Sequence, residues 1–357
     1  MIVFKAEQWQ KIGSTLFTAA GATRSNAERV AESLVDNNLA GHDSHGVIRI
    51  IQYLQAIEAG QLDPAGEPAV IHETPTSAMV DGKWTFGQVG AKLAMQKAIE
   101  KAKVQGIAIS ALIRAYHIGR LGEYSEMAHD AGMIAMVTVG GLGQGEVRTT
   151  GGVAPYGGAR PALSTNPISF GFPAGSEPPV MSDFATSAVA AGKVKLARAK
   201  GEPLPPDCIL DRDGKPSTDP EDYFKGGVLK TFGGHKGYAL AVVVDILGQA
   251  LTGADKCSNP EGKGSGSYMV AGSVFIAIDA GLFRPREEYA AATDAIIRRI
   301  KAIPPAAGFQ EVLLPGEPEQ RSKARRLREG LGLPEKSWAE ISEQAAKYKV
   351  DLKVLTD

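Results

Sequence analysis

The spacing of apolar residues predicts helices in the N-terminal part of the chain. Ser25 and Glu28 form a capping box ahead of an apolar series, and Gly41 ends that series, so the first forty residues are predicted to form two helices. From Ile48 to Ile57 an apolar residue recurs at every third position, which predicts a further helix with this apolar series on one face and Arg49 and Tyr53 on another. A short polar stretch therefore separates the second and third helices.

The C-terminal part shows the same kind of pattern with more charge. Helices are predicted over residues 287–301, 317–329 and 337–348, and Ser337 with Glu340 forms a second capping box. Because these helices resemble the N-terminal ones, residues 1–72 and 285–357 are predicted to build one discontinuous helical domain.

Between the two ends, strand and helix patterns alternate. Strands are predicted at residues 78–91 (with a turn), 107–113 and 133–139, and helices at 92–106, 121–131 and 238–251. Glycine-rich loops are predicted at 140–158 and 262–267, and a surface excursion at 201–227. Residues 73–284 therefore read as a central α/β domain.

Composition narrows the class of partner. Apolar residues make up 43% of the chain and charged residues 22%, which is typical of a globular protein. The charges of the 39 basic and 40 acidic residues nearly cancel, so nucleic acid and anionic membranes are not expected as partners. A small molecule is the expected partner. Cys208 and Cys257 fit neither a disulfide framework nor a zinc site, and the N-terminus lacks a signal-peptide pattern, so a cytoplasmic protein without a bound metal is expected.

The stretch after the second helix carries the densest chemistry. His42, Asp43, Ser44, His45 and Arg49 occur within nine residues, and Tyr53 follows Arg49 by one helical turn. Histidine transfers protons near neutral pH, and arginine matches a carboxylate with two parallel hydrogen bonds. The cluster is therefore predicted to bind an acid substrate and move a proton.

Standard nucleotide and hydrolase motifs are missing from the sequence. No glycine run has the GxGxxG spacing of a Rossmann dinucleotide site, and no Gly-Lys pair is followed by Ser or Thr as in a P-loop. The HExxH and GxSxG motifs are also absent. A Rossmann domain, a P-loop enzyme, a zincin and an α/β-hydrolase are therefore excluded.

Shorter polar clusters remain. Asp183 with nearby hydroxyls follows the apolar residues 180–181 and suits ribose or phosphate, although Asp183 could instead cap a helix near Thr186. His235 and Lys236 open an apolar helix, whose N-terminal N–H groups favour an anion. Residues 314–317 form a tight turn before a helix.

Taken in order, these segments resemble the malate/L-lactate dehydrogenase family of the non-Rossmann type, which includes sulfolactate, ureidoglycolate and diketogulonate oxidoreductases and cyclic imino acid reductases. The matching segments are 44–46 with Arg49 and Tyr53, 117–119, 165–167, 183–187 with 192–193, 233–237, 251–254 and 314–317. They run nearly from end to end of the chain.

The resemblance implies a NAD- or NADP-dependent enzyme, usually a homodimer, with a non-Rossmann fold of its own. The nucleotide would bind the central α/β domain, residues 73–284, which is built on a mixed sheet. The helical domain, residues 1–72 and 285–357, would serve substrate binding and dimerisation. Ser44 and His45 would form the proton-transfer pair, and Arg49 with Tyr53 would hold the substrate carboxylate. In some members the acid/base role is assigned to the histidine matching His117. The residues implied to line the nucleotide are His117, Gly119, Thr165, Asp183, Ala185, Thr186, Ser187, His235, Lys236, Pro315, Gly316 and Glu317.

One position separates the branches of this family. Imino acid reductases tend to carry an aspartate after the glycine matching Gly192, where this chain has Lys193, which is typical of the hydroxy acid branch. Hydride transfer between nicotinamide and a small 2-hydroxy/2-oxo acid such as malate or lactate is therefore the predicted activity. The alternatives are a piperideine or pyrroline-2-carboxylate reductase and a nucleotide-binding protein without catalysis. The sequence leaves NADH against NADPH open.

Overall fold

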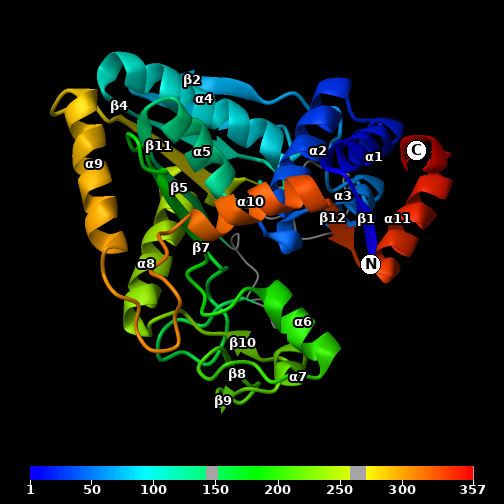
Figure 1. Ribbon diagram of the computed structural model, residues 1–357. Coiled ribbons are helices and arrows are strands. Elements are labelled where there is room, and N and C mark those ends of the chain that lie inside the picture. Colours follow the sequence, from blue (N-terminus) through cyan, green and yellow to red (C-terminus); the bar gives the residue numbers. More distant parts are fainter. Residues whose placement is uncertain (142–151, 258–270, 357) are drawn as a thin grey trace.

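A mixed seven-stranded sheet forms the centre of the molecule (Figure 1). This computed structural model describes residues 1–141, 152–257 and 271–356. The strand order is β2 (Ala69–Glu73), β3 (Ser77–Asp81), β4 (Ile107–Ile113), β11 (Gly272–Asp279), β5 (Met133–Gly140), β6 (Ile168–Phe172) and β7 (Val180–Phe184). Only the β3–β4 pair is parallel; the other five pairs are antiparallel. The predicted mixed-sheet α/β class is confirmed.

Helices cover both faces of this sheet. Helices α4 (Gly87–Gln105) and α5 (Gly122–Asp130) pack on the face that carries Val137 and Phe275. Because side chains alternate along a strand, Gly140 belongs to the opposite face, where α8 (His235–Ile246) and the π-turn Leu247–Leu251 contact β5. A Cβ on Gly140 would lie 2.1 Å from the Val244 carbonyl oxygen, so glycine permits this close packing.

Both chain ends contribute to a second core, at the right of Figure 1. There β1 (Ile2–Phe4) pairs antiparallel with β12 (Leu331–Leu333), so the two termini are joined by backbone hydrogen bonds. The helices of this part are α1 (Ala6–Ala19), α2 (Arg24–Leu39), α3 (Arg49–Glu58), α10 (Glu317–Glu329), α11 (Glu335–Lys347) and α12 (Lys353–Thr356). Trp9 is fully buried and donates from its indole nitrogen to the Leu331 carbonyl at 3.0 Å.

Two segments near the expected domain limits lie with the sheet. Strand β2 begins before residue 73 and pairs with β3. Helix α9 (Arg286–Lys301) presents Asp294 to the turn after β6, where its carboxylate accepts from the backbone N–H groups of Gly175 and Ser176 at 2.8 Å each. The division into two domains, with limits at 72 and 285, stays a prediction.

The proline-rich excursion forms a small separate unit. Strands β8 (Ile209–Leu210), β9 (Pro216–Ser217) and β10 (Val228–Leu229) make a three-stranded sheet, flanked by α6 (Ala191–Lys200) and α7 (Pro220–Phe224). Most of the predicted glycine-rich loop at 140–158, and all of the loop at 262–267, lie outside the described residues.

Several predicted helix starts were wrong. Thr23, not Ser25, caps α2, because its extended backbone turns its hydroxyl to accept from the Asn26 N–H at 3.2 Å. Pro334 precedes α11, so Ser337 lies inside the helix. The central helices predicted to begin at 92 and 238 begin at Gly87 and His235.

Candidate functional site

The two histidines implicated by the sequence lie together at a cavity between the helical part and the sheet. Their rings stack with centroids 5.3 Å apart and an interplanar angle of 28°. The cavity has a volume of about 300 Å³, and its lining includes His45, Tyr116, His117, Gly119 and Thr165. Residues 72 positions apart in the chain are thus brought together by the α2–α3 connection meeting the end of β4.

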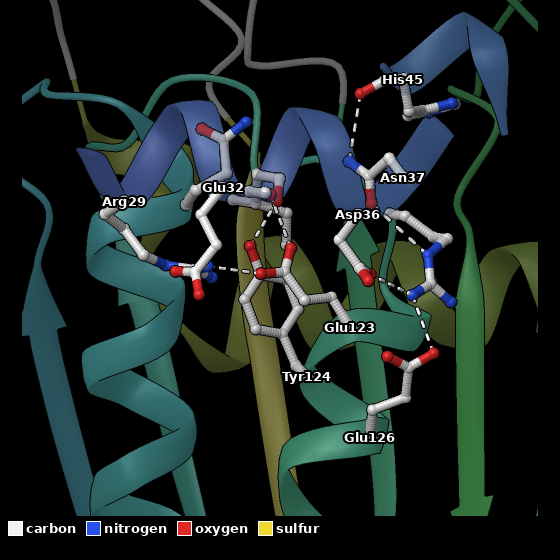
Figure 2. A network of polar contacts seen from close by, with 12 residues as sticks. Arg29, Glu32, Asp36, Asn37, His45, Glu123, Tyr124 and Glu126 are labelled. Atoms are coloured by element: carbon white, nitrogen blue, oxygen red, sulfur yellow. Dashed lines mark hydrogen bonds and ion pairs between the residues drawn. The ribbon is translucent and has the colours of Figure 1, made fainter. Parts of the chain in front are cut away.

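His45 lies on a short 3₁₀ turn, Asp43–His45, that follows α2. Its Nδ1 is 2.9 Å from the Ser44 hydroxyl oxygen, a pair in which either partner could donate. Asn37 in the last turn of α2 donates to the His45 carbonyl at 3.0 Å, a contact visible in Figure 2. A Cβ on Gly192 would lie 3.3 Å from the Ser44 Cβ, so the start of α6 lies directly against the predicted pair.

His117 follows β4, and its ring forms a hydrogen bond with a buried hydroxyl group. Its Nδ1 is 2.7 Å from the hydroxyl of Tyr53, which is fully buried in α3. Gln88 in the first turn of α4 donates to the same hydroxyl at 2.8 Å. Tyr53 was predicted to help hold a substrate carboxylate, but the contacts of its hydroxyl go to His117 and Gln88.

The burial of Tyr53 also corrects the predicted face of α3. The series of every third residue from Ile48 was expected to form the apolar face, yet Ile48 is 37% exposed. The buried residues are Ile50, Tyr53, Leu54 and Ala56, and the steps of three to four from Ile50 to Tyr53 and Leu54 fit the period of an α-helix. Arg49 precedes Ile50 and lies at the edge of this buried face, partly exposed.

Arg49 is anchored by two acceptors. Its Nε donates to the Ser44 carbonyl at 2.6 Å, and its Nη1 donates to the Gln52 side chain, which in turn donates to the Tyr116 hydroxyl at 3.0 Å. The guanidinium is therefore fixed next to the Ser44–His45 turn, with further N–H groups available to a ligand.

The electrostatics of the site keep both imidazoles neutral. Burial, and then the positive charge of Arg49, lower the pKa of His45 to about 3. The same two causes lower the pKa of His117 well below its usual value. A neutral imidazole can accept a proton, and an anion bound to Arg49 would offset the charge that lowers these pKa values.

The predicted nucleotide residues divide into three places. Thr165 lines the histidine cavity, and Thr186 is tied to it, because its backbone N–H and its hydroxyl donate to the Thr165 carbonyl at 2.9 and 3.0 Å. Ala185 and Ser187 flank Thr186, and the Ser187 hydroxyl donates to the Val189 carbonyl at 3.0 Å. This segment continues β7 and passes beside the cavity.

A second recess contains Asp183, Pro315 and Gly316. Asp183 accepts from the Gly122 N–H at 2.7 Å, so it caps α5 and not a helix near Thr186, where the next helix begins only at Ala191. Burial raises the pKa of the Asp183 carboxyl. The Glu317 carboxylate accepts from the Leu314 N–H at 2.7 Å, which closes the turn over residues 314–317.

His235 and Lys236 lie elsewhere, exposed at the start of α8. The His235 ring meets the exposed Tyr156 ring with centroids 6.0 Å apart. Among the described residues that line the histidine cavity, His235 and Lys236 are not included. Their predicted contact with a nucleotide stays a prediction.

Comparisons with known proteins identify the family of this chain. A family model described as malate/L-lactate dehydrogenase matches residues 4–342. The chain is 34% identical to the L-sulfolactate dehydrogenase of Methanocaldococcus jannaschii over 343 residues, 96% of each chain. A solved structure of sulfolactate dehydrogenase from that organism matches with a TM-score of 0.88 at 33% identity, covering 99% of both chains.

The chain belongs to the malate/L-lactate dehydrogenase family. It is also 32% identical to a Delta(1)-pyrroline-2-carboxylate/Delta(1)-piperideine-2-carboxylate reductase of Pseudomonas aeruginosa over 339 residues, 94% of this chain and 97% of that protein. The predicted family and the predicted class, an oxidoreductase of 2-hydroxy and 2-oxo acids, are confirmed. Membership of this dehydrogenase family implies a nicotinamide cofactor.

Sequence reasoning missed the residues that orient the family's motif. Asn37, Gln52 and Gln88 each hydrogen-bond a site residue or its backbone, but an isolated amide within a helix gives no signal. Arg120 was also missed. It is 3% exposed, and its guanidinium donates to Asp36 at 3.0 Å and to Glu126 at 2.8 Å, which joins α2 to α5.

Two features are absent from the part of the chain that the structure describes. None of the helices there is both long and apolar enough to cross a membrane. Within the same residues, no three His, Cys, Asp or Glu side chains gather in a way that could hold a metal ion.

Proposed function

We propose that this protein interconverts a small 2-hydroxy acid and its 2-oxo acid with NAD or NADP, using His45 to move the proton and Arg49 to hold the carboxylate. The proposal rests on the position of Arg49 beside the hydrogen-bonded pair Ser44 and His45. The Arg49 Nε donates to the Ser44 carbonyl oxygen at 2.6 Å. A proton-transfer group and a carboxylate-binding group thus share one turn of chain.

The cavity beside His117 fits a nicotinamide. Its walls combine apolar side chains, from Ile118, Leu121 and Val139, with the hydroxyl groups of Ser164 and Thr165. That mixture suits a flat ring that carries one carboxamide. We assign His117, Gly119 and Thr165 to this end of the cofactor, and Asp183, Pro315 and Gly316 to its other end. When bound, the cofactor supplies or takes up the hydride.

Arg49 fixes the substrate in this proposal. Gln52 and the Ser44 carbonyl hold the guanidinium from one side, so less side-chain freedom is lost when a carboxylate binds. A planar guanidinium can bind both carboxylate oxygens at once, which orients the neighbouring C2 atom. Tyr53 contributes indirectly, through His117.

His45 transfers the proton at the substrate oxygen. In oxidation the neutral imidazole accepts the hydroxyl proton, and in reduction the imidazolium returns a proton to the carbonyl oxygen. Ser44 orients the ring through Nδ1. Because the charge of Arg49 lowers the pKa of His45, a substrate carboxylate on Arg49 raises it again and makes the imidazolium accessible when substrate is present.

The alternative activity is reduction of a cyclic imino acid, which the Pseudomonas aeruginosa relative performs by its name. Gly192 lies against Ser44, so the residue that follows it is near the proton-transfer pair. In this chain that residue is Lys193, a cation, and not the aspartate typical of imine reductases. We therefore favour the hydroxy acid.

A substrate panel tests the choice. The purified protein is assayed with NADH and NADPH against the 2-oxo forms of malate, lactate and sulfolactate and against piperideine-2-carboxylate. We expect turnover of a 2-oxo acid, lost in Arg49→Met and retained in Arg24→Met, a control whose side chain is 88% exposed. Turnover of the imine alone would replace the proposal by its alternative, and nucleotide binding without any turnover would leave only a binding protein.

We also propose a homodimer with α8 at its interface. From Tyr238 to Ile246 this helix carries one charged residue, Asp245, and Val243 and Ile246 are 52% and 56% exposed. Together with the exposed Ala239 they follow one face of the helix, and apolar faces of this kind mark contact sites. Light scattering should give a dimer mass, and Val243→Arg should give a monomer.

Cytoplasmic localisation belongs to the same proposal. Cys208 and Cys257 are both free thiols, which fits a reducing compartment.

A further inference from the structure

Gln88 lies against the site without touching the cavity. It is fully buried in the first turn of α4, and its amide donates to Tyr53 at 2.8 Å. The preceding Gly87 lets this turn approach the chain at His117, because a Cβ there would lie 2.6 Å from the His117 carbonyl carbon. Gln88, Tyr53 and His117 thus form a continuous chain of hydrogen bonds from three different segments.

The available protons determine which group donates in each of these hydrogen bonds. The Tyr53 hydroxyl has one proton and is fully buried, so that proton needs an acceptor. Its partners are the Gln88 amide nitrogen, which only donates, and the His117 Nδ1 at 2.7 Å. Tyr53 therefore donates to Nδ1, and His117 carries its own proton on Nε2.

The orientation of the Gln88 amide decides this result. As placed, its oxygen is buried without a partner among the described residues. If the amide were reversed, its NH₂ group would take that position and both N–H groups would be buried without an acceptor. Buried unpaired N–H groups are rarer than buried unpaired carbonyls. Burial also raises the pKa of Tyr53, which keeps the phenol protonated and able to donate.

His45 has no such constraint. Its Nδ1 faces the Ser44 hydroxyl, which can donate or accept at 2.9 Å. His45 can therefore hold its proton on either nitrogen and can release or accept one at Nε2. If His117 released its Nε2 proton, Nδ1 would have to take the proton of Tyr53, leaving a phenolate in a fully buried place.

We propose that Gln88 is a positioning residue that, through Tyr53, fixes His117 in the Nε2–H form, so that His117 serves the cavity as a hydrogen-bond donor and His45 alone transfers the proton. The inference rests on the proposed function for its catalytic meaning. The tautomer itself is a property of the chain without substrate, so the two can fail separately.

Nitrogen NMR of histidine-labelled protein tests the tautomer directly. The chain has six histidines, so their ¹⁵N resonances can be resolved and His117 assigned by its loss in His117→Gln. We expect the wild-type protein at neutral pH to show Nε2 protonated and Nδ1 as an unprotonated acceptor. A wild-type spectrum with the proton on Nδ1 would overturn the proposal, whatever the variants show.

Gln88→Glu tests the role of Gln88. An ionised carboxylate can only accept, so Tyr53 would turn its proton to residue 88 and His117 would move its proton to Nδ1. Since a buried glutamate can have a pKa of about 8–9, the spectra are recorded up to about pH 9.5. An unchanged Nε2–H form over that range would remove Gln88 from the account.

Activity gives the second readout. Loss of the Nε2–H donor should lower kcat by about 10²-fold in Gln88→Glu. The matched control is Gln96→Glu, the same change on the exposed face of α4, which should alter neither the spectrum nor kcat. If the His117 proton moved to Nδ1 in Gln88→Glu while kcat stayed at the wild-type value, the role of Gln88 in setting the tautomer would be confirmed. A donor role for His117 in the reaction would then be excluded.

Discussion

His45 and His117 have stacked rings, and the pKa of each is lowered, yet their surroundings differ in kind. His45 is half-buried on a short turn, beside a serine hydroxyl that can rotate. His117 is held by a buried phenol whose proton has one direction to go. The pKa values cannot separate the two roles, but the partners of Nδ1 can.

Removing His45 should have the largest effect on activity. His45→Ala removes the proton-transfer group, so we expect kcat/KM for the 2-oxo acid to fall by about 10²–10⁴-fold. Nucleotide affinity, measured by fluorescence titration, should remain within a few-fold of wild type. A variant with near wild-type turnover would remove His45 from the mechanism.

Arg49→Lys should be next in size and should act on a different constant. The lysine retains the charge but loses the planar pair of donors, so a charge-assisted hydrogen bond worth about 1.5–3 kcal/mol is lost. We expect KM for the acid to rise by tenfold to about a hundredfold, with less change in kcat. A fall in kcat at unchanged KM would contradict the assignment of Arg49 to substrate binding.

Tyr53→Phe sharpens the comparison through stability. It leaves the Gln88 donor and the His117 Nδ1 without their shared partner, so the free energy of unfolding in urea should fall by about 1–3 kcal/mol. The control is Tyr116→Phe, because the partly buried Tyr116 hydroxyl accepts from Gln52 and water can replace it. If the free energy of unfolding fell equally in both variants, the buried hydrogen bonds of Tyr53 would be no more stabilising than the partly exposed one of Tyr116.

The smallest expected effect is a flat pH profile. The pKa of His45 in the free enzyme is lowered to about 3, so the neutral base stays present as pH falls from about 8 to 5. The kcat/KM for oxidation of the hydroxy acid should show no histidine limb in that range. A decline with a midpoint near the ordinary histidine value of about 6.5 would contradict the burial of His45.

The sequence predicted the elements whose signals are local. Strand β4 and helix α10 have the predicted limits, because an apolar run and a glycine-flanked charged helix are visible in the order of residues alone. Ser44, His45 and Arg49 became candidates for the same reason, since a polar cluster is dense within nine residues, and their roles stay a prediction.

Contacts between distant segments could not be predicted in this way. Tyr53 was placed beside Arg49 because one helical turn separates them, but packing against Phe17 and Phe86 rotates that face of α3 into the core. Asp183 caps α5, 61 positions earlier in the chain, a relation that only the pairing of β6 with β7 creates. Gln88 acquires its role through Tyr53 in the same long-range manner.

Rescue by free imidazole tests most directly which histidine moves the proton. His45→Ala and His117→Ala are assayed side by side with the 2-oxo acid while the imidazole concentration is raised. The account predicts that imidazole restores turnover in His45→Ala, in proportion to its concentration until saturation, and leaves His117→Ala unchanged. Restoration of His117→Ala alone would assign the proton to His117 and contradict the account.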